Sequence, residues 1–222
     1  MNKLFKIFFV ISVYIFILLT IFEYSSLNIN YFKDKFEENN TEEITGKSTE
    51  ELISISEKII KYLKGKRDDL IIHDEKGLVF EGREVEHMKD VKVLFNRGYM
   101  IRNSFFITAL TLGLILKLFY KNRILKILFY GGIIFSFILI IIGSIIIFNF
   151  NRAFVIFHEI LFTNDLWILD PEKDLLIQML PSNFFSDLGL IIVKRYVLTT
   201  VFMSAIYFLN KKLNKNYNEV TK

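Results

Sequence analysis

The chain has 222 residues, of which 52% are hydrophobic, with a formal net charge of +4 and a mean hydropathy of +0.38. It contains no cysteine, which excludes disulfide scaffolds, thiolate metal sites and cysteine nucleophiles. The composition also excludes disordered chains, collagen-like chains and nucleic-acid-binding tails. Its apolar residues gather in blocks that are longer than the elements of a soluble core.

Four of these blocks are long enough to cross a membrane. They cover residues 4–22, 104–120, 124–148 and, less cleanly, about 188–209. About 20 residues at a rise of about 1.5 Å span the hydrocarbon layer, where the backbone must satisfy its own hydrogen bonds and is therefore helical. The first block is predicted to be an uncleaved anchor, because its apolar run is long for a signal peptide and no small-residue cleavage site follows.

The pattern predicts an all-α polytopic membrane protein with four transmembrane helices and a small extracytoplasmic cap of helices with one short hairpin. The expected parts are a first transmembrane helix at 1–23, a cap segment at 24–103, transmembrane helices 2 and 3 with a short cytoplasmic loop at 104–148, an aromatic-rich active-site loop at 149–187, and transmembrane helix 4 with a basic cytoplasmic tail at 188–222.

Charge divides unevenly between the two sides of these spans. Segments 2–6, 117–126 and 210–222 hold ten basic residues, and Glu219 is their only acid. Segments 23–103 and 149–187 hold 16 basic and 23 acidic residues. Because basic residues collect on the cytoplasmic side, we expect both termini in the cytoplasm and both large segments outside, with the reversed orientation as the disfavoured alternative.

The first outer segment contains one clear helix signal. Residues 23–47 are expected to form a polar connection with at most a short helical piece. Residues 48–64 have the spacing of an amphipathic helix, with Ser48 and Glu51 as a capping box and Gly65 as a stop. Its apolar face packs on protein or, alternatively, lies on the membrane surface. That face comprises Leu52, Ile55, Ile59 and Leu63.

The rest of this segment predicts a hairpin followed by a helix. Apolar residues 70–72 and 78–80 flank the turn signal at 74–77. Helical spacing resumes over 83–100, and a helix that continued into the second span would hold His87 above the bilayer. A surface or packing histidine is the alternative for this residue.

The second outer segment, 149–187, contains both prolines and the only tryptophan, Trp167. Its aromatic residues alternate with charges, which is typical of the headgroup level of a bilayer. The segment is either an interfacial loop that caps the helices or a reaction pocket at the lipid–water boundary. Pro171 and Pro181 restrict the residues before them, so we expect a loop of defined shape.

No metal and no cofactor are expected. His158 and Glu159 begin a zincin-like pattern, but position 162 is Phe where the second histidine would stand. The remaining anomaly is Lys194 with Arg195, about two turns inside the fourth span. Such charges either snorkel toward the headgroups or line a polar pocket that reaches into the bilayer.

Three stretches resemble one known family. They are EVEHMKDVKVLF at 84–95, FVIFHEILFTNDLWILDP at 154–171 and LIQMLPSNFF at 176–185. Together with the four spans, they resemble the lipoprotein intramolecular transacylases (Lit). The resemblance implies an enzyme of lipoprotein maturation in the bacterial cell membrane, which moves an acyl chain from the sn-2 ester of diacylglyceryl-cysteine to the α-amine of that cysteine, giving a lyso-form lipoprotein. It also implies two functional histidines, His87 and His158.

The residues are compatible with this chemistry. An α-amine has a pKa of about 7.7–8, so a histidine base suffices to free it. We assign His158 as acid and base and His87 as the partner that orients it or stabilises the oxyanion, with exchanged roles as an alternative. The expected partners are a diacylated lipoprotein and membrane phospholipid, and no nucleic acid is expected. We expect the protein to be a monomer whose active site faces the outside of the cell. Candidates for binding or orientation are Arg152, Glu159, Asp165, Trp167, Asp170, Asp187, Lys194 and Arg195.

Two other function classes stay open. A hydrolase of membrane lipid or lipopeptide esters would use the same histidines with water as the acceptor and would release free fatty acid. A non-enzymatic membrane anchor or assembly protein would tolerate the loss of both histidines.

Overall fold

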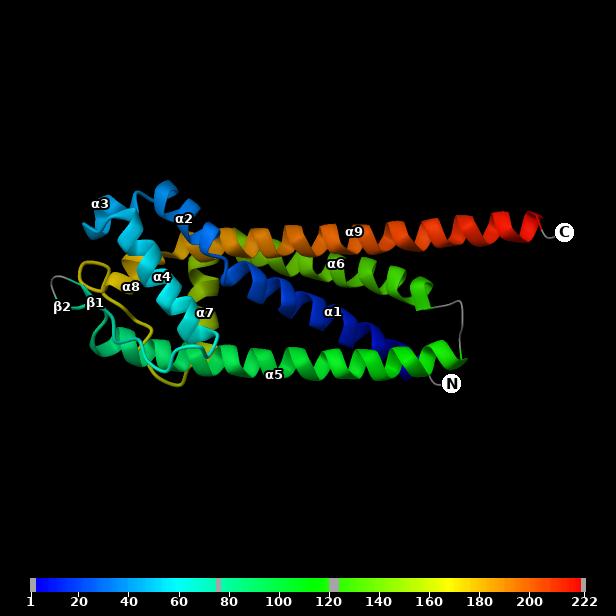
Figure 1. Cartoon of the computed structure of the whole chain (residues 1–222), viewed down its shortest axis with the longest axis horizontal. Coiled ribbons are helices and arrows are strands. Elements are labelled where there is room, and N and C mark those ends of the chain that lie inside the picture. Colours follow the sequence, from blue (N-terminus) through cyan, green and yellow to red (C-terminus); the bar gives the residue numbers. More distant parts are fainter. Residues whose placement is uncertain (1–2, 75–76, 120–123, 221–222) are drawn as a thin grey trace. The chain divides into compact units, whose positions relative to one another are not determined.

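The computed structural model describes residues 3–74, 77–119 and 124–220. In these ranges the chain forms nine helices and one two-stranded hairpin (Figure 1). Four of the described helices, α1, α5, α6 and α9, are long and apolar enough to cross a membrane. The elements are α1 (Lys3–Ser26), α2 (Ile29–Glu38), α3 (Thr41–Thr45), α4 (Thr49–Leu63), β1 (His73–Asp74), β2 (Gly77–Leu78), α5 (Gly82–Phe119), α6 (Ile124–Phe148), α7 (Phe150–Leu161), α8 (Leu175–Met179) and α9 (Ser182–Val220).

The predicted class, an all-α protein with four transmembrane helices, is confirmed. The predicted third span coincides with α6. The other three helices run beyond their apolar blocks, because helix geometry continues where hydrophobicity ends. In particular, α5 begins well before the predicted second span and carries His87 in its second turn.

The chain divides into two compact units, each described here by itself. The helical unit comprises residues 1–22, 100–145 and 190–222, and the cap unit comprises residues 23–99 and 146–189. The beginning of α5, the end of α6 and the beginning of α9 therefore belong to the cap unit.

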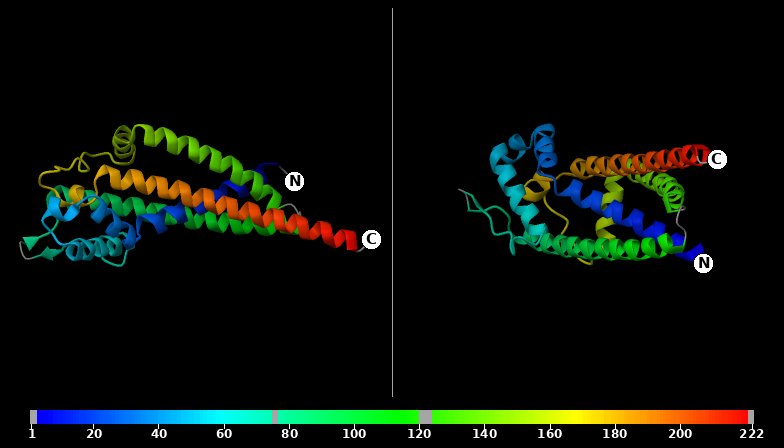
Figure 2. Two further views of the ribbon diagram at one scale, coloured as in Figure 1. Left: turned by 90° about the horizontal axis from the view of Figure 1, so that it is seen from above. Right: turned by 45° about the vertical axis from the view of Figure 1, so that its right-hand side comes forward.

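Within the helical unit, α1 contacts each of the other three helices. It is the blue helix in both views of Figure 2. The Phe16 ring lies 5.0 Å from the Phe106 ring of α5, and the Tyr14 ring lies 6.3 Å from the Tyr196 ring of α9, centroid to centroid. The Tyr14 hydroxyl donates a hydrogen bond of 2.6 Å to the carbonyl oxygen of Leu128 in α6. A polar group in the hydrocarbon layer is thus satisfied by a neighbouring helix.

Glycine permits the close approach of α1 to α6. A Cβ atom on Gly131 would lie 2.5 Å from Val10 Cγ1, and one on Gly132 would lie 2.6 Å from the Tyr14 hydroxyl. Close contacts of this kind, rather than a hydrophobic driving force, hold helices together in lipid.

The cap unit corrects the expectation for residues 23–47. The predicted polar connection is wrong, because this segment forms the helices α2 and α3. Tyr31, Phe32 and Phe36 are buried on one face of α2. Lys35, which is also buried, interrupts the apolar pattern of that face. Because a lysine is normally counted as an exposed position, the pattern did not predict a helix.

Lys35 is buried because two carboxylates neutralise it. Its Nζ lies 2.5 Å from Asp187 Oδ2, in the first turns of α9, and 2.6 Å from Glu38 Oε2. Burial opposes the charged ammonium, but the bonds to Asp187 and Glu38 outweigh it and raise the pKa of Lys35. The Tyr31 hydroxyl adds a 2.5 Å hydrogen bond to the carbonyl oxygen of Phe184. These contacts attach α2 to the beginning of α9.

The predicted helix at 48–64 is present as α4. Both bonds of the capping box exist, since Glu51 N donates to Ser48 Oγ (3.3 Å) and Ser48 N donates to Glu51 Oε2 (2.8 Å). The structure favours protein packing over the membrane surface for its apolar face, because all four positions are buried. They are Leu52, Ile55, Ile59 and Leu63.

The hairpin forms, but each of its strands is only two residues long and lies closer to the turn than expected. Asp74 pairs with Gly77 and His73 with Leu78, so the two ends of the expected turn belong to the strands. Glu75 and Lys76 lie outside the described residues, as do three of the basic residues counted for orientation, Lys121, Arg123 and Lys222.

The expectation of a loop over 149–187 also needs correction. Residues 150–161 form the 12-residue helix α7, capped by Asn149, whose Oδ1 accepts from Arg152 N at 3.3 Å. Residues 150–161 have an apolar spacing as clear as that of α4, but the aromatic residues and prolines of the segment outweighed it in the expectation of a loop. The expected effect of Pro181 holds, since the preceding Leu180 leaves α geometry and ends α8.

We predict that Gly131→Ala lowers the thermal unfolding temperature of the detergent-solubilised protein. The new methyl group would meet the branched, stiff side chain of Val10, and such overpacking costs about 1–3 kcal/mol. The matched control is Gly98→Ala, because nothing lies within 4 Å of a Cβ atom there. Equal unfolding temperatures for the two variants would contradict the close approach of α1 and α6.

Candidate active site

Two buried histidines face each other in the cap unit. His87 lies in the second turn of α5 and His158 in the last turn of α7, with 8% and 6% of their surfaces exposed. Their ring centroids are 5.9 Å apart and their planes differ by 37°. The structure thus brings together the two histidines that the sequence singled out, whereas His73 lies exposed in the hairpin.

The surroundings of His158 define which nitrogen is free. Its Nδ1 lies 2.7 Å from the carbonyl oxygen of Phe154. Since a carbonyl oxygen only accepts, Nδ1 carries the hydrogen and Nε2 of the neutral ring keeps a lone pair. Burial lowers the pKa of His158 below its ordinary value of 6.5, and the bond to Phe154 opposes this shift only in part. His158 is therefore neutral at pH 7, with Nε2 able to accept a proton.

His87 has an unused polar atom. Its Nδ1 is buried and has no hydrogen-bond partner among the described residues. Such an atom is uncommon in folded proteins and indicates a site for water or a bound group. The centroids are too far apart for a direct bond between the rings, because a ring nitrogen lies little more than an ångström from the ring centre.

Aromatic side chains surround His158. The indole of Trp167 stacks on its ring at 4.8 Å between centroids, with an interplanar angle of 29°. The rings of Phe154, Phe157 and Phe162 lie at 4.3, 5.4 and 5.6 Å. This enclosure limits the access of water, and the face of an aromatic ring favours the imidazolium that forms when His158 takes a proton.

A buried carboxylate holds the second outer segment against the start of α5. Glu84, which is 5% exposed, accepts a 2.7 Å hydrogen bond from the buried backbone N–H of Leu176 in α8. Its other oxygen accepts from the N–H of Glu81 at 3.3 Å and so caps α5. Because Glu84 stands three residues before His87, it fixes α8 close to the histidine pair.

Two exposed polar contacts, one on each side of His87 along α5, also hold the second outer segment against this helix. Arg83 donates to the carbonyl oxygen of Asp165 at 2.5 Å and lies 3.2 Å from its carboxylate. Asn164 donates to Asp90 Oδ2 at 2.8 Å. Both contacts join α5 to the stretch that follows α7, next to Trp167. The sequence did not predict these contacts, because no local pattern relates α5 to the residues it contacts. The spacing of three residues between Glu84 and His87 does place them on the same face of a helix.

The remaining sequence candidates in the cap unit lie in other surroundings. Arg152 and Glu159 are exposed on α7. Asp170 accepts from Glu172 N at 2.9 Å and lies 3.3 Å from Lys173 Nζ, and these two contacts lower the pKa of Asp170. Asp170 therefore shapes the turn that precedes α8.

Lys194 and Arg195 lie in the part of α9 that belongs to the helical unit. Lys194 is exposed and Arg195 is half-buried.

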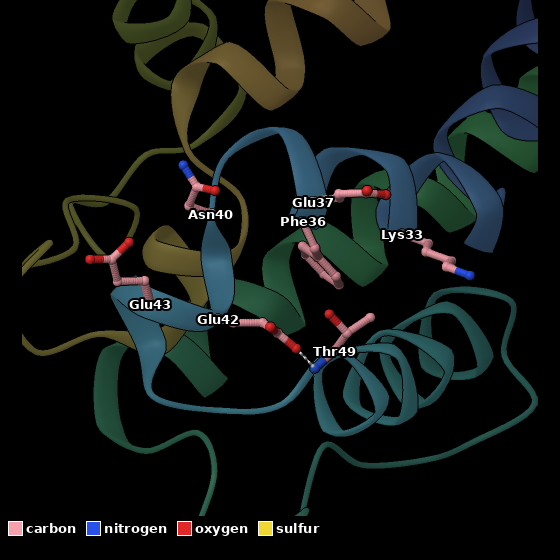
Figure 3. Close-up of a pocket in the computed structure, with 7 residues that line it drawn as sticks. All are labelled: Lys33, Phe36, Glu37, Asn40, Glu42, Glu43 and Thr49. Carbon is pink, nitrogen blue, oxygen red and sulfur yellow. Dashed lines mark hydrogen bonds between the residues drawn. The ribbon is translucent and has the colours of Figure 1, made fainter.

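Two hollows of the cap unit contain neither histidine. One, of about 690 Å³, lies beside the start of α5 and the hairpin, and Arg83 and Leu166 are among its lining residues. The other, of about 560 Å³, lies among α2, α3 and α4 and is lined by Glu37, Glu42 and Glu43 (Figure 3). Across the described ranges, no group of three His, Asp or Glu side chains is placed to hold a metal ion.

The model of the family described as lipoprotein intramolecular transacylase Lit matches residues 7–185. The chain belongs to the Lit family. A membrane-integral Lit from Bacillus cereus is similar in structure, with a TM-score of 0.81, 25% sequence identity and coverage of 96% of this chain and 97% of that one. A variant of the Bacillus cereus protein with one histidine replaced by arginine has the same fold, with a TM-score of 0.80, 23% identity and coverage of 96% and 94%.

An uncharacterized protein of Aquifex aeolicus (strain VF5) is 29% identical over 185 residues, which are 77% of this chain and 82% of the relative. Membership of the Lit family and the likeness to membrane-integral Lit establish a multi-pass membrane protein. They support a lipoprotein transacylase kind of function.

We predict that His158 of this Lit family member titrates below pH 6.5, because burial disfavours its charged form. The measurement is an NMR titration with histidine-selective carbon labelling, which gives signals from only three residues. The signal of His158 is the one that disappears in His158→Gln. The unfolded chain binds the proton at a higher pH than the folded chain, so the free energy of unfolding falls as the pH drops through 6.5. A midpoint at or above 6.5 would contradict the burial of the ring.

We also predict that Glu84→Ala lowers the free energy of unfolding by about 1–3 kcal/mol, because the buried N–H of Leu176 loses its acceptor. Hydrogen exchange at residues 170–181 should become faster. The control is Glu86→Ala, which removes only an exposed ion pair with Lys89 and should change stability by less than about 1 kcal/mol. Unchanged exchange in Glu84→Ala would show that another contact holds this segment.

Proposed function

We propose that the protein moves the sn-2 acyl chain of a diacylglyceryl-cysteine to the α-amine of the same cysteine and so makes a lyso-form lipoprotein. The observation that carries this proposal is the buried pair of His87 and His158, in which the bond from Nδ1 to Phe154 leaves Nε2 of His158 as a base. Membership of the Lit family supports the same reaction class.

The reaction needs one proton to be taken and returned. After the substrate ammonium has lost its first proton to solvent, the amine nitrogen attacks the sn-2 ester carbonyl and His158 Nε2 accepts the proton that this nitrogen releases. The tetrahedral intermediate then breaks the bond between the carbonyl carbon and the glycerol oxygen. His158 returns the proton to that oxygen, and the acyl chain remains on nitrogen as an amide. No water is consumed.

His87 is suited to the role of partner. Its unpaired Nδ1 lies on a ring that is 5.9 Å from the ring of His158, centroid to centroid, so the two histidines are near enough to contact the same reacting group. If Nδ1 carries the hydrogen, it can donate to the oxyanion of the tetrahedral intermediate, where such a donor acts on charge that develops in the transition state.

The arrangement favours amine over water as the acceptor. Donor and acceptor belong to one molecule, so the substrate supplies much of the required proximity. The rings of Trp167 and Phe162 narrow the space around His158 in which water could compete. Acid–base catalysis contributes about 10²–10⁴-fold, so positioning must supply the rest of the acceleration.

The proposed setting is the outer face of the bacterial cell membrane, with both termini cytoplasmic and the protein acting as a monomer. The excess of basic residues in segments 2–6, 117–126 and 210–222 supports this orientation. Arg152, Lys194 and Arg195 are proposed contacts for phosphate or carbonyl oxygens of phospholipid or substrate, because their charge complements those groups.

One observation keeps a second function in view. The free Nε2 of His158 is also able to take a proton from water, and a water activated in this way would turn the site into a hydrolase of lipid or lipopeptide esters. The two reactions differ in product, since hydrolysis releases free fatty acid and transfer does not.

Tandem mass spectrometry of a lipoprotein distinguishes these functions. The protein would be expressed with a diacylated lipoprotein in cells that lack other N-acylation, and the N-terminal lipopeptide would be fragmented, because transfer leaves its mass unchanged. We expect one acyl chain on nitrogen and one on glycerol. His158→Ala should lower the yield of this product by about 10²–10⁴-fold.

The matched control is His73→Ala, which removes an exposed histidine of the hairpin and should leave the product unchanged. Two acyl chains that remain on glycerol, with folded protein and substrate both present, would refute the proposal. Loss of one chain as fatty acid would establish the hydrolase instead.

A further inference from the structure

Helix α7 leaves one apolar side uncovered. Ile156, Phe157, Ile160 and Leu161 are 42%, 49%, 76% and 40% exposed. Ile156 and Ile160 are four residues apart, as are Phe157 and Leu161, and Phe157 and Ile160 are three apart. Residues at these spacings are neighbours on a helix, so the four side chains form a continuous surface, called here the α7 apolar face.

The other sides of α7 have different surroundings. Arg152 and Glu159 are exposed on a polar side. His158 points away from both, is buried, and lies against Trp167 and His87. Three sides of one short helix therefore offer an apolar surface, a polar surface and the histidine site. This division is typical of a helix that lies in the interface of a bilayer.

The chain itself indicates what covers the α7 apolar face. Only Asn149 separates α7 from α6, one of the four helices able to cross a membrane. The last turn of α6 belongs to the same unit as α7, and its Ile146, Ile147 and Phe148 are 39%, 37% and 93% exposed. The apolar surface of a spanning helix thus continues within one residue into that of α7, so both meet the same apolar medium.

We propose that the α7 apolar face inserts into the bilayer leaflet on the side of the cap unit and sets the depth of His158. An interfacial helix buries its apolar face about 5–10 Å into the boundary between headgroups and acyl chains, which is the level of the glycerol esters. The functional part, that His158 meets the sn-2 ester at this depth, rests on the proposed transacylase reaction. A diacylated substrate then reaches the histidines sideways, with its acyl chains still in the lipid.

Spin labels can test the lipid contact without any enzyme assay. Because the chain has no cysteine, single-cysteine variants carry one label each. Ile160→Cys reports the α7 apolar face, and Glu159→Cys on the polar side is the matched control. Both would be reconstituted in vesicles of phosphatidylglycerol and phosphatidylethanolamine, and collisions of the nitroxide with oxygen and with a water-soluble nickel chelate would be measured.

We expect the label at position 160 to collide more with oxygen than with nickel, and the label at 159 to show the reverse. A label at 160 that meets nickel as often as the label at 159 would overturn the proposal, since the α7 apolar face would then lie in water. A label at 160 shielded from both reagents would also overturn it and would identify a protein partner as the cover.

The depth of His158 needs a separate measurement in the same vesicles. Ile160→Asp should lower turnover several-fold, because a charge draws the helix out of the lipid, whereas Ile160→Leu should leave turnover unchanged. Unchanged NMR signals of the carbon-labelled histidines in Ile160→Asp would confirm that the histidine site of this variant is intact. Full turnover of Ile160→Asp would refute the functional part. Lipid contact in a wild-type protein without transacylase product would instead refute the proposed function and leave the lipid contact standing.

Discussion

The hydrogen bond from His158 Nδ1 to the carbonyl oxygen of Phe154 determines what the site can do. A neutral imidazole has one donor and one acceptor, so committing the donor to the backbone leaves the acceptor free. Burial keeps the ring neutral at pH 7, and helix geometry keeps the bond local, because donor and acceptor lie four residues apart within α7. The base is therefore prepared by one short helix.

The second requirement is that His87 meets His158, and polar contacts beyond the two rings secure it. Glu84 binds the backbone of Leu176, while Arg83 and Asp90 hold Asp165 and Asn164. All three residues of α5 lie within about one turn of His87. The loss of any of these three contacts would leave both histidines unchanged but would allow the distance between them to change. The contacts therefore act by fixing the position of His87 relative to His158.

Several features follow from the sequence because their causes are local. The four spans follow from length and hydrophobicity, and α4 follows from Ser48, Glu51 and its apolar spacing. The helix α2 was missed because the ion pairs that allow Lys35 to be buried come partly from Asp187, far away in the chain. The helix α7 was missed although its apolar spacing is helical, because the aromatic residues and prolines of 149–187 favoured a loop.

By itself, the sequence determined that the chain crosses a membrane four times, which side carries more basic residues, and that histidine is the available base, because hydrophobicity, charge and residue type are properties of single segments. The resemblance to Lit pointed to His87 and His158. Only the tertiary structure decided that these rings lie 5.9 Å apart, that Nε2 of His158 is the free nitrogen, and that Glu84 supports the site. Those facts depend on contacts between residues distant in the chain or on the orientation of one ring, which no local pattern encodes.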